Sequence, residues 1–138
     1  MNREVRFRGK RIDNGEWVYG DLENCRIRKC TFIHCYTEDG NYHKQHEVDA
    51  ETIGQYTGLQ DKDGKDIYEG DVLKHNTSTF SGVVTWNSNG YFYIKEKHIL
   101  FPDEEPSCTP LGEMIVMGDF VVINNIHDNP ELLKGGEE

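Results

Sequence analysis

The 138-residue chain has little positive charge, no long apolar run and few prolines. It carries 15 Lys and Arg against 25 Asp and Glu, which gives a formal net charge of −10. Because Lys and Arg supply most non-specific affinity for phosphate, this balance disfavours a general nucleic-acid-binding protein. No apolar run approaches the roughly 20 residues of a membrane-spanning helix, and the N-terminus shows no signal peptide. We therefore expect a cytoplasmic protein without membrane contact.

The common catalytic motifs are also missing. The sequence contains no phosphate loop, no G-x-G-x-x-G, no H-E-x-x-H and no G-x-S-x-G. It has no Cys-x-x-Cys either, although Cys25, Cys30 and Cys35 lie near His34, His43 and His46. Zinc sites usually pair ligands two to four residues apart, whereas these cysteines are five apart. We predict free thiols and no metal or other cofactor, and the sequence leaves the role of these six residues open.

A thiol nucleophile is the enzymatic alternative. Cys35 and His43 flank a predicted turn at residues 38–41, so a hairpin could bring them together. A Cys–His pair also needs an orienting third group, which no pattern in this sequence supplies. The prediction is therefore a non-enzymatic protein, with a thiol- or metal-dependent enzyme as the disfavoured alternative.

The charge is unevenly spread along the chain. Residues 1–30 hold eight Lys and Arg against five Asp and Glu, a net of +3. Residues 31–138 hold seven against twenty, a net of −13. Three interpretations stay open: ordinary surface variation, a basic arm lying on the acidic body of its own or a neighbouring subunit, or a basic arm that contacts nucleic acid.

Short alternating segments separated by turn residues predict a mainly β protein. Residues 3–11 alternate apolar and charged side chains, and Asp-Asn-Gly at 13–15 is a strong hairpin signal. A second hairpin is predicted from strands at 82–86 and 91–94 around Asn-Gly, with Trp86, Tyr91 and Tyr93 pairing across it. We further predict final strands at 114–117 and 119–126.

The stretch from Thr52 to Leu73 has the most closely spaced turn residues in the chain. It reads as a strand, a turn at 61–65 with Asp-Gly, a second turn at 69–71 and a new strand. Its carboxylates do not have calcium-loop spacing, because Leu59 and Gly70 would occupy the first and last ligand positions. We interpret the stretch as structural.

The same stretch resembles the signature of the YopX family of phage and prophage proteins. The pattern comprises G-Q-Y-T-G-L at 54–59, D-K-D-G-K at 61–65 and I-Y-E-G-D at 67–71. The segments F-R-G-K at 7–10, G-E-W-V-Y-G at 15–20 and I-H-D-N-P-E-L-L at 126–133 are similar to the family's two ends. The resemblance implies a small, mostly β protein of mobile-element origin in a bacterial host, and it brings no catalytic residues to carry over.

Together these observations predict a single YopX-like domain over residues 1–134. Residues 1–50 would form an N-terminal hairpin extension with variable strands, and residues 52–134 a small, partly open SH3-like barrel. A short helical turn is predicted to begin at Pro130, and residues 135–138 are predicted to be a disordered tail.

For function, the sequence favours a phage or prophage accessory protein that acts by self-association and by binding a host or phage macromolecule. The alternative is a nucleic-acid-binding module built on the basic N-terminal segment, which the net charge disfavours. The candidate interaction surface combines basic and aromatic side chains: Arg6, Arg8, Lys10, Arg11, Trp17, Arg26, Arg28, Lys29, Trp86, Tyr91 and Tyr93.

Overall fold

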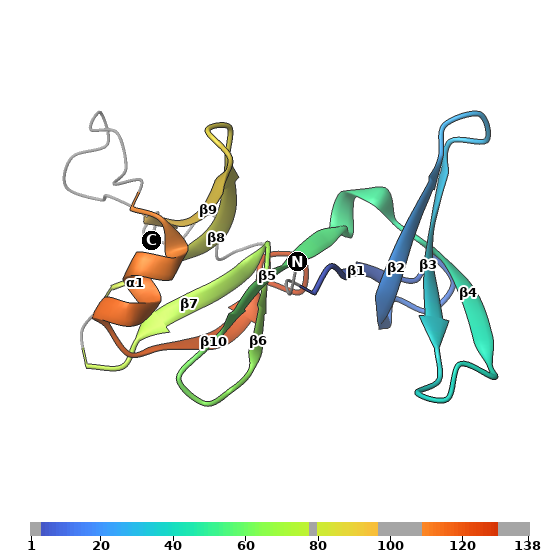
Figure 1. Cartoon of the computed structure of the whole chain (residues 1–138). Helices are drawn as coiled ribbons and strands as arrows, with labels where there is room; N and C mark the ends of the chain where they lie inside the picture. Colours follow the sequence, from blue (N-terminus) through green and yellow to red (C-terminus); the bar gives the residue numbers. More distant parts are fainter. Residues whose placement is uncertain (1–3, 78–79, 97–108, 130–138) are drawn as a thin grey trace. The chain divides into compact units, whose positions relative to one another are not determined.

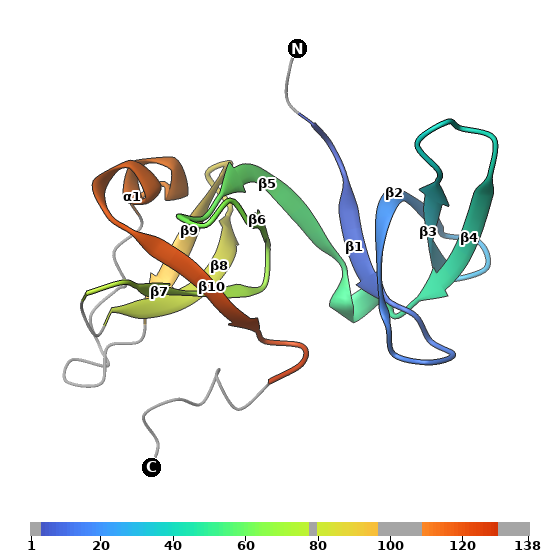
Figure 2. The ribbon, with the colours of Figure 1, turned by 90° about the horizontal axis from the view of Figure 1, so that it is seen from below.

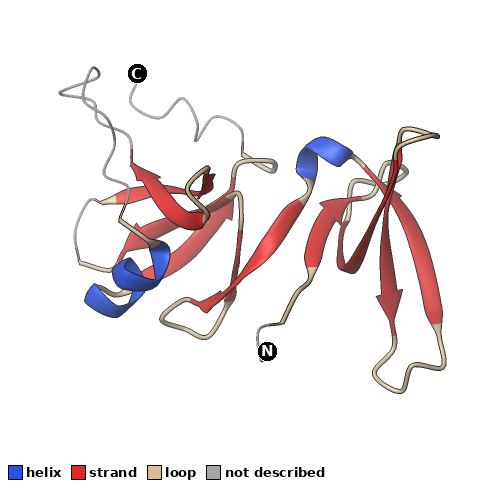
Figure 3. Ribbon diagram, turned by 45° about the horizontal axis from the view of Figure 1, so that its top comes forward, coloured by secondary structure: helices blue, strands red, loops and turns tan. Residues whose placement is uncertain are grey.

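A computed structural model describes residues 4–77, 80–96 and 109–129, and these residues are mainly β-strand (Figure 3). In chain order the elements of the described residues are β1 (Phe7–Lys10), β2 (Trp17–Cys25), β3 (Cys30–Tyr36), β4 (His43–Val48), the 3-10 helix η1 (Ala50–Thr52), β5 (Gly54–Gln60), β6 (Asp66–Tyr68), β7 (Asp71–His75), β8 (Ser81–Asn87), β9 (Tyr91–Glu96), α1 (Leu111–Met117) and β10 (Phe120–Asn125) (Figure 1). The predicted mainly β class is confirmed.

The chain forms two compact units, Met1–Gly58 and Leu59–Glu138. The boundary falls inside β5, so this strand contributes its first residues to one unit and its last residues to the other. The prediction of one domain over residues 1–134 stays a prediction.

The first unit holds strands of a six-stranded antiparallel sheet in the order β4-β3-β2-β1-β5-β6, of which β6 follows the unit boundary in sequence. The predicted N-terminal hairpin is confirmed, since β1 pairs with β2 and Gly15 takes the positive φ of 73° that its turn needs. The end of β1 also bridges β4 between Arg11 and Val48, so the sheet bends back on itself there. Ile33 and Val48 are buried in this unit.

Register decides which side chains share a face of β2, β3 and β4. Ile33 lies opposite Leu22 and His46, and these residues form the inner face together with Cys35. His34 lies opposite Asp21 and Gln45 and belongs to the other, exposed face. The alternation of a pleated strand therefore separates neighbours in sequence such as His34 and Cys35.

The second unit contains the antiparallel sheet β10-β7-β8-β9 (Figure 2). The hairpin predicted at 82–94 is confirmed as β8 and β9 with a turn at Gly90. The core residues of this unit are Ile67, Leu73, Val84, Ile94, Leu111 and Phe120. They come from β6, β7, β8, β9, α1 and β10, so every element of this unit from β6 onward contributes to one core.

The turns predicted in the signature stretch are present, and two aspartates hold them. The Asp61 carboxylate, 8% exposed, accepts the backbone N–H groups of Asp63 and Lys65 at 2.9 Å and that of Val122 at 3.0 Å. The buried Asp71 carboxylate accepts the N–H of Tyr68 at 2.8 Å. Both carboxylates thus satisfy backbone donors at the turns, which explains the preference for aspartate at these positions.

The strand predicted at 114–117 was wrong. Residues 111–117 form the helix α1 instead of a strand, because Leu111, Met114 and Ile115 recur at helical spacing and pack on the core. The described residues form two antiparallel sheets that do not close into a barrel, and the SH3-like detail of the predicted partly open barrel stays a prediction. The helical turn predicted at residue 130 and the tail at 135–138 lie outside the described residues.

Candidate functional site

Two of the predicted basic residues of β1 pack on an aromatic ring. The Arg8 guanidinium carbon lies 4.7 Å from the centroid of the Trp17 ring, and the Lys10 Nζ lies 5.6 Å from it. The register explains this contact, since Lys10 lies opposite Trp17 and Arg8 opposite Tyr19 on the same face. Arg8 is only 5% exposed. These cation–π contacts, each about 0.5–2 kcal/mol, belong to the packing of the first unit.

Arg6 and Arg11 also have partners within the first unit. The Arg6 guanidinium lies 4.3 Å from the centroid of the Tyr56 ring, and its Nε is 3.5 Å from Glu4. Arg11 donates to both carboxylate oxygens of Asp13, at 2.9 and 2.6 Å. This bidentate hydrogen bond lowers the pKa of Asp13. Four predicted surface cations are therefore engaged locally.

Three basic residues lie at the end of the β2–β3 hairpin. They are the other described Lys and Arg residues of positions 1–30. Arg26, Arg28 and Lys29 are exposed in the turn between the two strands, and Lys29 has a φ of 55°. Between them stands Ile27, which is 95% exposed. We call Arg26, Ile27, Arg28 and Lys29 the basic tip. The three cations of the tip were predicted from the sequence and Ile27 was not, although an isoleucine inside a cationic turn is itself a signal of an exposed apolar contact.

An open hollow of about 510 Å³ lies beside the base of this hairpin. Its charged lining residues are Lys10, Arg11, Lys29, Glu47 and Asp49. Because both signs are present, the lining favours neither an anionic nor a cationic small molecule.

A chain of hydrogen bonds crosses the exposed face of β2, β3 and β4. His34 Nε2 lies 2.7 Å from Glu23 Oε1, and His34 Nδ1 lies 2.6 Å from His43 Nε2. The Tyr36 ring stacks on His43 with centroids 4.6 Å apart. Across the part of the chain that the structure describes, no group of three or more His, Cys, Asp or Glu is arranged to hold a metal ion. Glu23 was not among the predicted residues, because only the strand register brings it to His34.

The residue pairs suggested by sequence spacing do not form. His43 and His46 are three apart in one strand, so they point to opposite faces of the sheet. Cys35 lies opposite Lys44 and His43 opposite Tyr36, which also places Cys35 and His43 on opposite faces.

Partial burial lowers the pKa of His46, and the charges of Arg11 and Lys44 lower it further.

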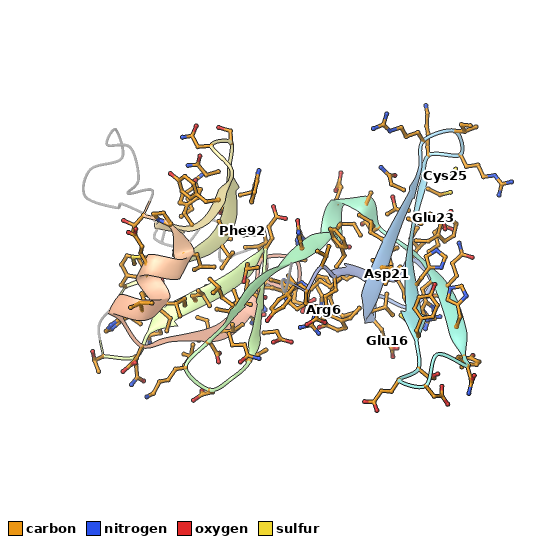
Figure 4. The ribbon with its side chains drawn as sticks, in the orientation of Figure 1. Arg6, Glu16, Asp21, Glu23, Cys25 and Phe92 are labelled. Atoms are coloured by element: carbon orange, nitrogen blue, oxygen red, sulfur yellow. The ribbon has the colours of Figure 1, made fainter. Side chains whose placement is uncertain are left out.

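Two cysteines do come together, at the base of the basic tip. Cys25 and Cys30 are directly opposite in the register of β2 and β3, and Figure 4 shows Cys25 at the tip end of the hairpin. Both side chains are partly buried and are free thiols. Partial desolvation raises the pKa of the Cys30 thiol, and the neighbouring Cys25 and Glu47 raise it further.

The predicted aromatic row of the second unit is divided between two faces. Trp86 is 49% exposed and lies opposite Phe92, with ring centroids 4.8 Å apart. Tyr91 and Tyr93 point to the other face, and Tyr93 is buried. The expected pairing of Trp86 with the two tyrosines is wrong, because residues 91 and 93 alternate with 92.

The fold and this surface define a small, mainly β protein with a cationic hairpin. A family described as YopX protein matches residues 6–134, and the chain belongs to this family. Among solved structures, the crystal structure of protein EF1440 from Enterococcus faecalis is similar, with a TM-score of 0.53 and 20% sequence identity. That likeness covers 96% of this chain and 99% of the other, and it shows the fold alone. No curated protein matches this sequence. Within the described residues, no helix has the length and apolar character needed to cross a bilayer.

Proposed function

We propose that this protein is a non-enzymatic accessory protein of phage or prophage origin that acts in the bacterial cytoplasm by self-association and macromolecular binding. The basic tip is the surface that carries the proposal. It holds three cations and an almost fully exposed isoleucine on a two-stranded ribbon. An apolar side chain held out among cations is suited to a partner that offers an apolar contact inside an acidic rim.

A second copy of the chain has the required charge. Residues 31–138 carry a net charge of −13, whereas residues 1–30 carry +3. Arg6 and Arg11 lie beside Glu4 and Asp13, and Arg8 is buried. The three cations of the tip, by contrast, are exposed to a partner. The proposed assembly therefore places the tip of one copy on an acidic surface of another.

Light scattering tests this proposal through the salt dependence of the mass in solution. The wild-type protein is measured at about 0.1 M and about 1 M salt, where the Debye length is about 10 Å and about 3 Å. We expect a multiple of the 16.0 kDa monomer mass at low salt and a smaller species at high salt. A monomer at low salt and high protein concentration would exclude self-association.

Charge reversal locates the contact. We expect the triple variant Arg26→Glu, Arg28→Glu, Lys29→Glu to remain monomeric at both salt concentrations. The matched control reverses the exposed Lys62, Lys65 and Lys95, which changes the net charge equally but leaves the tip intact. Equal loss of assembly in both variants would show that overall charge, and not the tip, controls association.

Nucleic acid is the second candidate partner, and Ile27 is the observation that favours it. Ribbons that enter the minor groove combine Arg or Lys with an apolar wedge between base steps. A gel-shift assay with duplex DNA at low salt distinguishes the two partners. Retardation by the wild type that the tip variant abolishes would replace the second copy by nucleic acid as the partner.

A further inference from the structure

The base of the basic tip places two thiols against one another. Cys25 ends β2 and Cys30 begins β3, and each is the other's register partner. They are the residues that flank the four-residue turn 26–29. Both are partly accessible free thiols. Cys35, the third cysteine that the structure describes, lies on the opposite face of β3 and opposes Lys44.

We propose that Cys25 and Cys30 form a dithiol–disulfide couple that closes across the end of the β2–β3 hairpin. Directly opposite residues of an antiparallel pair have Cβ atoms about 4.5–5.5 Å apart, and a disulfide needs about 3.5–4.5 Å. Closure therefore requires an approach of about 1 Å, which the end of a hairpin can supply more easily than its middle.

The same geometry makes the bond labile. A disulfide formed by drawing two strands together stores strain, and strained, accessible disulfides are reduced more readily than relaxed buried ones. The couple is thus suited to reversible oxidation and not to permanent stabilisation.

The chemistry requires an oxidant, for which a small disulfide such as oxidised glutathione is sufficient. The thiolate of one cysteine attacks a glutathione sulfur, which forms a mixed disulfide and releases one glutathione thiolate. The second cysteine loses its proton and attacks the protein sulfur of that mixed disulfide. The Cys25–Cys30 bond forms and a second glutathione thiolate leaves, so two protein thiols are oxidised while one small disulfide is reduced.

The experiment compares two variants that each keep one pair of cysteines. The variant Cys35→Ser, Cys108→Ser retains the proposed couple, and the reciprocal variant Cys25→Ser, Cys30→Ser retains the other two. Each folded protein is treated with oxidised glutathione and analysed by intact mass and peptide mapping. We expect the first to lose two hydrogen atoms and give a peptide linking residues 25 and 30, and the reciprocal variant to carry glutathione adducts.

The yield of the Cys25–Cys30 disulfide should exceed the yield of the product with two glutathione adducts by at least about tenfold, because the register holds the two cysteines opposite one another. Removing one partner, with Cys25→Ser in the first background, should convert the product to a single glutathione adduct on Cys30. Two glutathione adducts on the intact pair, or an equal yield of disulfide from the reciprocal variant, would overturn the inference.

Oxidation also has a consequence for the tip, and this part depends on the proposed function. A bond at the base of the turn restricts the conformations of Arg26, Ile27, Arg28 and Lys29 that a partner meets. Light scattering on the oxidised and reduced forms measures this effect separately. The mass analysis decides whether the couple exists whatever the assembly assay shows.

Discussion

The Asp61 carboxylate accepts a hydrogen bond from the backbone N–H of Val122 at 3.0 Å, although 61 residues separate the two in sequence. The other carboxylate oxygen accepts from two N–H groups of its own turn. One side chain therefore joins the signature turn to β10. The YopX signature is best understood as the part of the sequence that fixes this junction.

Substitution of Asp61 should destabilise the second unit. Asp61→Ala leaves three backbone donors without their acceptor, and we expect a loss of about 2–4 kcal/mol in the free energy of unfolding. Urea unfolding followed by Trp86 fluorescence in a Trp17→Phe background reports this unit alone. The exposed neighbour provides the control, since Asp63→Ala should change stability by less than about 0.5 kcal/mol. Equal effects of the two substitutions would contradict the role assigned to Asp61.

Gly20 should be intolerant of any side chain. A Cβ atom at this position would lie 2.1 Å from the carbonyl oxygen of His34, a backbone atom that cannot rotate away. We expect Gly20→Ala to destabilise the first unit by about 3 kcal/mol. Trp17 fluorescence during urea unfolding, in a Trp86→Phe background, measures the effect. Asp21→Ala, at the adjacent exposed position, serves as the control. A comparable loss in the free energy of unfolding for Asp21→Ala would show that strand β2 is generally sensitive to substitution.

The stability of the first unit should depend on the protonation of His46. Its pKa is lowered in the folded state by partial burial and by Arg11 and Lys44. As the pH falls through the unfolded-state pKa of about 6.5, the unfolded chain binds a proton before the folded chain does. Stability that is present above this pH is therefore lost as the pH decreases.

The comparison with His46→Gln isolates this contribution from that of the other histidines. Between pH 7.5 and 5.5, the variant should lose less stability than the wild type in urea unfolding monitored by Trp17. Identical pH profiles would show that the folded and unfolded states bind the proton equally.

Alkylation of Cys30 should be slow at neutral pH. Partial desolvation, Cys25 and Glu47 raise the pKa of this thiol, so it carries less thiolate at a given pH than an unperturbed cysteine. We expect its rate with iodoacetamide, followed by peptide mass spectrometry, to keep increasing above pH 9. Cys25→Ser removes one cause of the shift and should move the rate profile to lower pH. An unchanged profile would mean that Cys25 does not influence Cys30.

The turns of the chain were predicted correctly, because they depend on residues that are adjacent in the sequence. The turns at 13–15, 61–65 and 87–90 follow from glycine beside Asp or Asn, which needs no information from distant residues. The sequence predicted a strand at 114–117, where the structure has the helix α1. Met114-Ile115-Val116-Met117 is an apolar run, which also fits a buried strand. In the structure Val116 is 87% exposed, and Leu111 anchors the helix from before that run.

The candidate site depends more on tertiary structure. The sequence alone determined that the chain is mainly β, acidic overall and basic near its start, because composition and turn residues act over a few positions. Only the strand register decided that Cys25 meets Cys30, that Glu23 meets His34, and that Cys35 and His43 are separated. Register is set by which face of each strand the core buries, and a shift of one residue would reverse every pair. That choice is made by packing across the whole sheet, so it cannot be obtained from the spacing within any single strand.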